Sequence, residues 1–428
     1  MTEIAFDPFS DAQRDDPYPA YAELRRHSPV TKLETTGRFG SGAFAVARYA
    51  DVSFVLRHPE LFSSSAMQSA MSGGIASSFA GGLSAGEAAR IAELLKTMPI
   101  SLTEQLGARS LIASDPPKHW PMRSLVNRGF TPRRIAQLET RIREIARASL
   151  AELEGKPEFD IVSQFFVPLP VTVITELLGV EPERSADFKR WSDSAVAGAT
   201  GGAGAIGPAQ VLQSLAELSH YIMGVVELRR QSPKEDLIST LIRAEDGETA
   251  LTPVEVVMFT LLLLVAGNET TTNLLGNTLL ALMAHPDELA RVRREPRRIP
   301  ALVEEALRYD GPIQFLFRQA TRDVDLAGVK IPEGATVIPL LGSANRDDAQ
   351  FPDAERFDVS RNTQGHLAFG LGIHFCLGAS LARLEARIAL EELLPRFVAF
   401  ERLDPNVQYV DSYLVRGPQR LPLRASAS

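Results

Sequence analysis

The feature that most constrains the fold is a long apolar segment that ends at His285-Pro286. Thr252 suits the N-cap of a helix, Pro253 suits its first position, and Glu255 completes a capping box. The residue before a proline avoids the helical region, so the helix should end near His285. The spacing predicts a helix of about 33 residues, roughly 50 Å long. Its first half is apolar nearly all round, so it should run through a core.

The middle of this helix breaks the apolar pattern with Ala266-Gly267-Asn268-Glu269-Thr270. An acid in an apolar helix costs free energy unless it has a partner or a purpose. In one interpretation Glu269 forms a structural ion pair and the threonines bond back to preceding carbonyls. In the other, the acid and the hydroxyl do chemistry. The pattern alone leaves both interpretations open.

A second landmark is the glycine-rich stretch FGLGIHFCLG, Phe369 to Gly378, which holds Cys376, the only cysteine of the chain. A lone cysteine is inert packing, a nucleophile or a metal ligand. The glycines let backbone approach a flat partner, and a helical pattern follows, whose N-terminus favours a thiolate. A nucleophile needs a base, and only His374 is near in sequence. A thiolate on such a glycine-flattened loop suits a fifth ligand to haem iron.

The pattern F-G-x-G-x-H-x-C-x-G closely resembles the haem-binding signature of the cytochromes P-450, the haem-thiolate monooxygenases. With three further motifs in order, the resemblance covers nearly the whole chain. It implies a mainly α fold with a smaller β-rich part (α+β), a triangular helical prism with haem b between the long central helix and the cysteine loop. We expect one domain over residues 1–428, β-rich at about 28–63 and 313–345 and helical at about 115–310 and 376–398.

The haem contacts implied by the resemblance come from four parts of the chain. Asp115-Pro-Pro can cap and start a helix. His119 and Arg123 lie four apart on one face of that predicted helix and could clasp a carboxylate; a solvated basic face would look the same. Buried propionates need such partners. The full set of expected haem contacts is His119, Arg123, Ala266, Gly267, Arg318, Phe369, His374, Cys376 and Gly378, with Cys376 as the iron ligand.

The helix interruption matches the family's oxygen-activation motif, small-Gly-x-acid-Thr. The resemblance implies that Glu269 and Thr270 relay protons, while Ala266 and Gly267 leave room for dioxygen. Glu stands where many bacterial members have Asp.

A further pair, Glu305 and Arg308, is spaced for an ion pair on a helix and matches the family's E-x-x-R signature. Arg356 matches the third member of that triad. This triad is structural in the family, so we assign it no chemistry.

The substrate pocket is expected to be mostly apolar. The resemblance assigns to it Leu262, Val265, Ala266, Ile313, Gln314, Phe315 and Val415. Such a lining suggests a hydrophobic substrate such as a terpenoid, steroid, fatty acid or polyketide, and Gln314 could bond one polar group. Two segments, 64–113 and 195–211, are rich in small residues. They cover the pocket in the family, and we hypothesise that the second is mobile without ligand.

Composition limits the classes of binding partner and the cell compartments that we expect for the chain. Lys and Arg total 45 against 53 for Asp and Glu, so the net charge is −8, which argues against nucleic-acid binding. The N-terminus lacks the pattern of a signal peptide, and the most apolar run is too short to cross a bilayer. One cysteine fits a reducing compartment. These observations predict a cytoplasmic protein without a membrane anchor, which we expect to be a monomer.

The predicted activity is insertion of one oxygen atom from dioxygen into an organic substrate. A ferredoxin and its reductase should supply electrons, docking on a basic patch near Cys376. A peroxide-driven peroxygenase is one alternative, although such members usually lack the acid–threonine pair. A haem-binding sensor or carrier without turnover is the other.

Overall fold

The computed structural model describes residues 6–34, 42–67, 84–200, 207–243 and 250–427, and divides into two compact units. Unit 1 comprises Met1–Met67, Leu138–Leu169 and Thr270–Ser428, and unit 2 comprises Gln68–Gln137 and Pro170–Glu269. All β-strands of the described residues belong to unit 1, while unit 2 is helical. The expectation of a mainly α chain with a smaller β-rich part is confirmed. The assignment of residues 1–428 to one domain stays a prediction.

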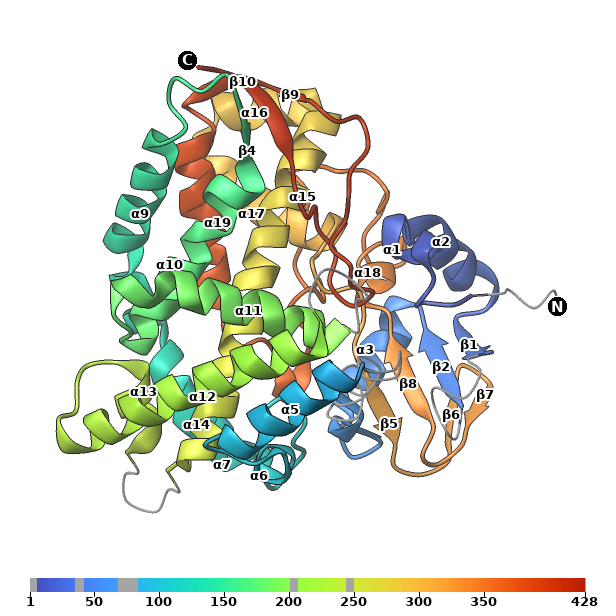
Figure 1. Cartoon of the computed structure of the whole chain (residues 1–428). Helices are drawn as coiled ribbons and strands as arrows, with labels where there is room; N and C mark the ends of the chain where they lie inside the picture. The colour runs from blue at the N-terminus through green and yellow to red at the C-terminus, as the bar shows by residue number, and fades with distance from the viewer. Residues whose placement is uncertain (1–5, 35–41, 68–83, 201–206, 244–249, 428) are drawn as a thin grey trace. The chain divides into compact units, whose positions relative to one another are not determined.

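The main sheet of unit 1 has five strands in the order β1-β2-β8-β5-β3 (Figure 1). Its strands are β1 (Val30–Leu33), β2 (Ala43–Val46), β3 (Phe62–Ser63), β5 (Arg318–Ala320) and β8 (Thr336–Pro339). β2 runs parallel to β8, and the other pairs are antiparallel. Every residue of β2 is buried, as expected of a strand covered on both faces. These strands lie within the two ranges expected to be β-rich.

Two smaller sheets complete the β structure of unit 1. β4 (Glu158–Asp160), β10 (Pro422–Ala427) and β9 (Phe397–Arg402) form one sheet in that order, so β9 is an edge strand. β6 (Val324–Leu326) and β7 (Val329–Ile331) form a hairpin. Ala327 and Gly328 in its turn both have positive φ, as a tight two-residue turn requires.

The helices of unit 1 gather around α15, which contacts α17, α19 and η2. They are α1 (Asp11–Asp15), α2 (Tyr18–His27), α3 (Tyr49–Arg57), α9 (Glu139–Ala151), η2 (Val162–Phe166), α15 (Thr270–Ala284), α16 (Pro286–Arg294), η5 (Pro296–Arg298), α17 (Ile299–Tyr309), α18 (Leu341–Ala344), η6 (Gly372–His374) and α19 (Ala379–Leu393). α15 is buried at almost every position, which places it in the core of this unit.

Two glycines let the loop before β10 lie close against α15. A Cβ on Gly276 would come within 2.5 Å of the Pro418 ring, and a Cβ on Gly417 would come within 2.4 Å of Asn273. Asn277, one turn further along α15, donates from Nδ2 to the Arg416 carbonyl at 3.1 Å. The loop is therefore held in place by close packing and a buried hydrogen bond.

Unit 2 is built from helices only. They are α5 (Ala85–Thr97), α6 (Leu102–Gly107), α7 (His119–Asn127), η1 (Arg128–Phe130), α8 (Pro132–Gln137), α10 (Pro168–Leu178, whose first two residues belong to unit 1), η3 (Pro182–Arg184), α11 (Ser185–Thr200), α12 (Pro208–Gln231), α13 (Leu237–Ile242), α14 (Pro253–Leu264) and η4 (Val265–Glu269). α12 packs along α5, α11, α13 and α14. Arg109 forms a bidentate ion pair with Glu255 in the first turn of α14.

Turns of the chain set the bounds of two helical regions. Residues 169–191 do not form one helix, because α10 ends at Leu178 and α11 begins at Ser185. Gly179 has φ +76°, and a Cβ there would clash with Asp236, so the chain turns at this glycine. Likewise, α7 begins at His119 and not at Asp115. The Asp115 carbonyl accepts from the His119 N–H at 3.0 Å.

The long helix predicted from the caps is present as α14, η4 and α15, which together run from Pro253 to Ala284. Its N-terminus has the expected capping box between Thr252 and Glu255. By length and composition this helix could cross a membrane, and half of its most apolar window is buried; the core helix of a soluble protein can meet the same criteria. Central parts of the segments 64–113 and 195–211, including residues 68–83 and 201–206, lie outside the described residues.

Candidate functional site

The cysteine loop, Phe369–Gly378, lies in unit 1; it contains η6 and leads into α19. Gly370 and Gly372 have φ +69° and +73°, and a Cβ on Gly372 would lie 2.7 Å from the Leu56 carbonyl oxygen. Both positions therefore favour glycine. The Cys376 N–H donates to the Phe369 carbonyl at 2.9 Å, which closes the loop. The half-buried Cys376 thus lies three residues before α19, where a helix N-terminus favours the thiolate.

Behind this loop lies the buried pair Glu305 and Arg308 on α17. The carboxylate and guanidinium are joined by two hydrogen bonds of 2.7 and 2.8 Å, and both side chains are fully buried. Arg308 also donates to the Asn345 carbonyl at 2.9 Å. The Asn345 side chain in turn accepts from the Leu367 N–H, two residues before Phe369. The pair therefore supports the segment that leads into the cysteine loop.

The third arginine of this triad is not the one expected from the sequence. Arg356 turns its carbonyl toward Arg308, at 3.1 Å, while its side chain is 61% exposed. Arg361 takes its place: its Nε lies 3.4 Å from the Glu305 carboxylate, and its side chain is 10% exposed. Arg361 also donates to the Asp353 carbonyl. The expectation for Arg356 is corrected, because spacing alone cannot tell which way a loop side chain points.

Of the remaining expected haem contacts in unit 1, Arg318 is the first residue of β5 and His374 the last of η6. Arg318 is buried, and its Nη1 donates to the Phe317 carbonyl at 2.8 Å. Gly378 is the N-cap of α19, and a Cβ there would meet nothing within 4 Å. Phe369 is held by ring contacts with His366 and Phe375.

In unit 2, His119 and Arg123 lie one turn apart on α7, on the helical face that the spacing predicts. His119 is fully buried, and Arg123 is half-buried. Burial and the neighbouring Arg123 charge lower the pKa of His119. Both side chains carry donors suited to an acidic ligand group.

The interruption predicted in the long helix is a π-helical turn, η4, over Val265–Glu269. Ala266 is exposed, and a Cβ on Gly267 would meet nothing within 4 Å. Next to the turn, Ser192 of α11 donates to the Leu264 carbonyl at 3.3 Å and accepts from Asn268 Nδ2 at 3.2 Å. Such turns often occur at functional sites. Glu269 is half-buried rather than buried, and the half-buried Thr270 follows it as the first residue of α15.

The expected pocket residues divide into two groups. Leu262, Val265 and Ile313 are half-buried, and Ile313 pairs in an isolated bridge with Val415, which is itself buried. By contrast, Gln314 and Phe315 belong to the core. Gln314 is 3% exposed and its Nε2 already donates to the Gly311 carbonyl at 2.9 Å. The Phe315 ring packs edge-on against Phe9. The expectation that these two side chains face a substrate is not supported, because the extended segment turns them toward the interior.

One notable buried acid was missed from the sequence. Glu385 on α19 is 3% exposed, and burial raises its pKa to about 8, although a hydrogen bond with Thr271 offsets part of the effect. It is therefore neutral at pH 7. Thr271 directly follows Thr270. The signal was available in the helical spacing of α19, where Glu385 falls on the same face as the buried Leu381 and Ile388.

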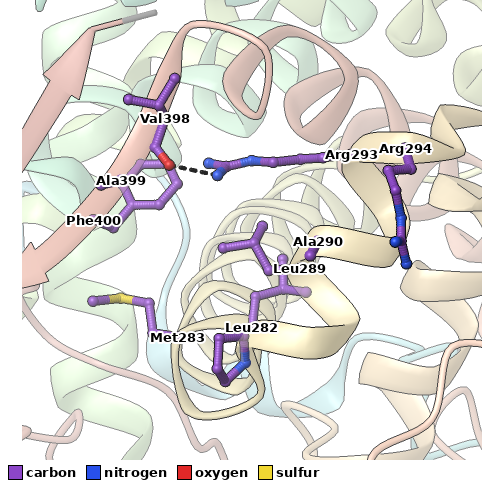
Figure 2. A pocket seen from close by; sticks show the side chains of 10 residues that line it. Leu282, Met283, Leu289, Ala290, Arg293, Arg294, Val398, Ala399 and Phe400 are labelled. Atoms are coloured by element: carbon purple, nitrogen blue, oxygen red, sulfur yellow. Dashed lines mark hydrogen bonds between the residues drawn. The ribbon is translucent and has the colours of Figure 1, made fainter.

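A groove of about 520 Å³ lies elsewhere on unit 1, between α16, the end of α15 and β9. Figure 2 shows Arg293 reaching across it to the Val398 carbonyl, with Leu282, Met283 and Leu289 on its apolar wall. None of the expected site residues lines it. Arg293 here ties α16 to the edge strand β9, so the groove is a structural junction apart from the candidate site.

The donor set suits a haem. Cys376 offers one thiolate on a loop whose glycines remove side chains, and Gly267 leaves open space beside the π turn. In unit 2, His119 and Arg123 carry cationic or N–H donors suited to acidic groups such as propionates, and in unit 1 Arg318 and His374 do so. A thiolate is a known haem ligand that favours O–O cleavage.

The comparisons agree with this chemistry. The family model for cytochrome P450 matches residues 211–419. 6-Deoxyerythronolide B hydroxylase of Saccharopolyspora erythraea is 38% identical, over 97% of this chain and 97% of that protein. The structure of CYP109Q5 from Chondromyces apiculatus is 43% identical, with a TM-score of 0.82 and coverage of 99% and 98%. CYP109E1 from Bacillus megaterium, solved with testosterone, is 36% identical, with a TM-score of 0.78 and coverage of 96% and 99%.

The chain therefore belongs to the cytochrome P450 family, of the bacterial type, and it is a monooxygenase with the fold of that family. Its family implies a haem-iron cofactor and small-molecule substrates.

Proposed function

We propose that Cys376 ligates the iron of haem b and that the enzyme oxygenates a bulky, largely apolar substrate of the steroid or macrolide-polyketide class. The proposal rests mainly on one observation, a single thiol held by a closed, glycine-shaped loop at a helix N-terminus. Two relatives support the substrate class. One is named as a hydroxylase of 6-deoxyerythronolide B, and the other was solved with testosterone. The half-buried Leu262, Val265 and Ile313 supply an apolar surface.

When bound, haem supplies the oxygen chemistry, and the protein positions the substrate and controls protons and water. One oxygen atom enters the product and the other leaves as water, so protons must reach the site. We assign their delivery to the Glu269 carboxyl and the Thr270 hydroxyl, which follow the π turn. Ala266 and Gly267 carry the smallest side chains of this segment and so keep space beside it. His119, Arg123, Arg318 and His374 would hold the propionates.

Electrons would come from a ferredoxin and its reductase in the cytoplasm, delivered to a monomeric enzyme. The stretch from Pro116 to Leu138 carries five lysines and arginines and no acid. Lys118 and Arg133 in it are exposed. Such a positive segment would attract an acidic partner despite the negative total charge. Turnover with a ferredoxin should therefore fall as salt rises, and Lys118→Glu with Arg133→Glu should raise the KM for ferredoxin. Turnover that is insensitive to salt would contradict this docking.

The substrate class is tested by titrating purified enzyme with a steroid, a macrolactone, a terpenoid and a fatty acid while following the haem spin state. We expect the steroid or the macrolactone to shift the Soret band at micromolar concentration and to yield a hydroxylated product with a surrogate ferredoxin system. Stronger shifts and product from the terpenoid or the fatty acid would overturn the assigned class.

A further inference from the structure

Two adjacent glutamates on α17 hold different parts of the chain. Glu305 binds Arg308, while Glu304 faces residues on either side of the cysteine loop. Arg383 of α19 donates to both Glu304 oxygens, from Nε at 2.6 Å and from Nη2 at 2.9 Å. His366 lies 3.0 Å from the same carboxylate through Nε2. We refer to Glu304, His366 and Arg383 as the Glu304 cluster.

The cluster encloses Phe369. The Arg383 guanidinium lies over the Phe369 ring, 4.5 Å from its centroid, and the His366 ring is 6.0 Å away. A cation over an aromatic face is attracted by the ring, and the bidentate carboxylate fixes the plane of the guanidinium. The Phe369 ring is therefore held by a charge whose own position is fixed.

The His366 ring is oriented by a further contact. The Ala368 N–H donates to His366 Nδ1 at 3.3 Å, so the proton of the neutral ring is on Nε2 and points to Glu304. Burial alone would raise the pKa of Glu304, but the hydrogen bonds from His366 and Arg383 outweigh it and lower the pKa to about 2. The ionised form of Glu304 is therefore favoured.

The Phe369 backbone connects the cluster to the cysteine. Its carbonyl accepts the Cys376 N–H at 2.9 Å. We propose that the Glu304 cluster is a positioning device for the proposed thiolate ligand, which acts by fixing Phe369 and, through its carbonyl, the backbone of Cys376. This inference rests on the proposed role of Cys376 and assigns Glu304, His366 and Arg383 no contact with substrate.

Arg387, one turn further along α19, offers a matched control. It pairs with Glu139 and Glu391, and its side chain is 26% exposed against 35% for Arg383. No contact with Phe369 is described for it. Both arginines form carboxylate pairs from the same helix, so a general loss of stability should affect the two variants alike.

The experiment compares the holoenzyme with Arg383→Gln, Arg383→Lys, Glu304→Gln and Arg387→Gln. Haem content, thermal midpoint, reduction potential and the Soret band of the reduced carbon monoxide complex are measured. The far-shifted Soret band of the reduced carbon monoxide complex marks thiolate ligation. We expect this band to decay several-fold faster in Arg383→Gln and Glu304→Gln than in the wild type, and the reduction potential to change. Arg383→Lys should recover part of the effect, because it keeps the charge without the planar fork. Arg387→Gln should lower only the thermal midpoint.

A double-mutant cycle tests whether Phe369 is the intermediary. In the Phe369→Leu background, Arg383→Gln should change the decay of the thiolate band much less than it does alone, because the shared path is already lost. Additive effects, or equal decay in Arg383→Gln and Arg387→Gln, would overturn this inference alone. A wild-type complex without the far-shifted band would overturn it together with the assignment of Cys376.

Discussion

The cysteine loop and the π turn η4 both interrupt regular structure, but they are held in different ways. Two glutamates of α17 hold the cysteine loop and the segment before it. Glu304 binds Arg383, which lies over the Phe369 ring. Glu305 binds Arg308, which bonds to Asn345, and Asn345 accepts from the Leu367 N–H. At the turn, the Ser192 hydroxyl bonds both the Leu264 carbonyl and the Asn268 amide, while Ala266 is exposed. A metal ligand needs a fixed backbone, which fits the role proposed for Cys376. Proton transfer to a reacting centre needs open space beside it, which fits the roles proposed for Glu269 and Thr270.

The largest expected effect concerns Glu385, which sits on the helix that follows the loop. Its pKa is raised to about 8 in the folded protein against about 4.5 when unfolded. The folded state therefore holds a proton that the unfolded state releases, and stability is lost as the pH rises from about 4.5 to about 8. By the free energy per pKa unit, the loss reaches a few kcal/mol.

Glu385→Gln cannot ionise, so it should lack this decline and become more stable than wild type at pH 8. Unfolding midpoints of the two holoproteins between pH 5 and pH 8.5 check the prediction. Parallel curves would show that Glu385 is not protonated in the folded enzyme.

The second prediction compares Arg361 and Arg356, of which only one should stabilise the buried Glu305. Arg361→Ala removes a nearly buried guanidinium beside Glu305 and should cost about 2–3 kcal/mol, because hydrogen bonds of charged groups are strong and their partners stay buried. Arg356→Ala removes an exposed side chain and should cost less than about 0.5 kcal/mol. Chemical denaturation measures both. A larger loss in Arg356→Ala would restore the expectation from the sequence.

At the π turn, Thr270→Ala should leave haem content and the absorption spectrum unchanged but uncouple oxygen consumption from product formation. Removing a proton-transfer group should lower product formed per dioxygen consumed by roughly tenfold or more. Thr278→Ala is the control, since Thr278 lies on the same helix and only bonds back to the Leu274 carbonyl. Equal coupling in both variants would remove Thr270 from the proton path.

The smallest effect is expected at the edge of the π turn. Ser192→Ala deletes the hydroxyl that joins the Leu264 carbonyl and the Asn268 amide, and should cost about 1 kcal/mol. Amide hydrogen exchange should rise at residues near 264–270 and stay unchanged in the cysteine loop. Faster exchange in the loop as well would mean that the two regions are coupled.

Much of the cysteine loop and of the helix interruption could be predicted from the sequence, because both depend on residues close together in the chain. The caps of α14, the glycine-shaped cysteine loop and the Glu305–Arg308 spacing are short-range signals. The π turn was visible as a polar interruption, although its hydrogen-bond geometry was not. Local spacing also misplaced the start of α7, since a turn of the chain follows Asp115.

What could not be predicted depends on contacts between residues far apart in sequence. Arg361 replaces Arg356 beside Glu305 because of how a loop folds back onto α17. The partnership of Glu304 with His366 and Arg383 spans 62 and 79 residues. No helical or strand period connects positions at such separations.

The close packing of the loop before β10 limits how the substrate specificity of this enzyme can be engineered. Gly276 and Gly417 have no room for a side chain, so a larger residue at either position would displace Pro418 or Asn273. Variant libraries aimed at altered regioselectivity would do better to leave both glycines untouched. Of the proposed pocket residues, the half-buried Leu262 and Ile313 are better first targets than Val415, which is buried.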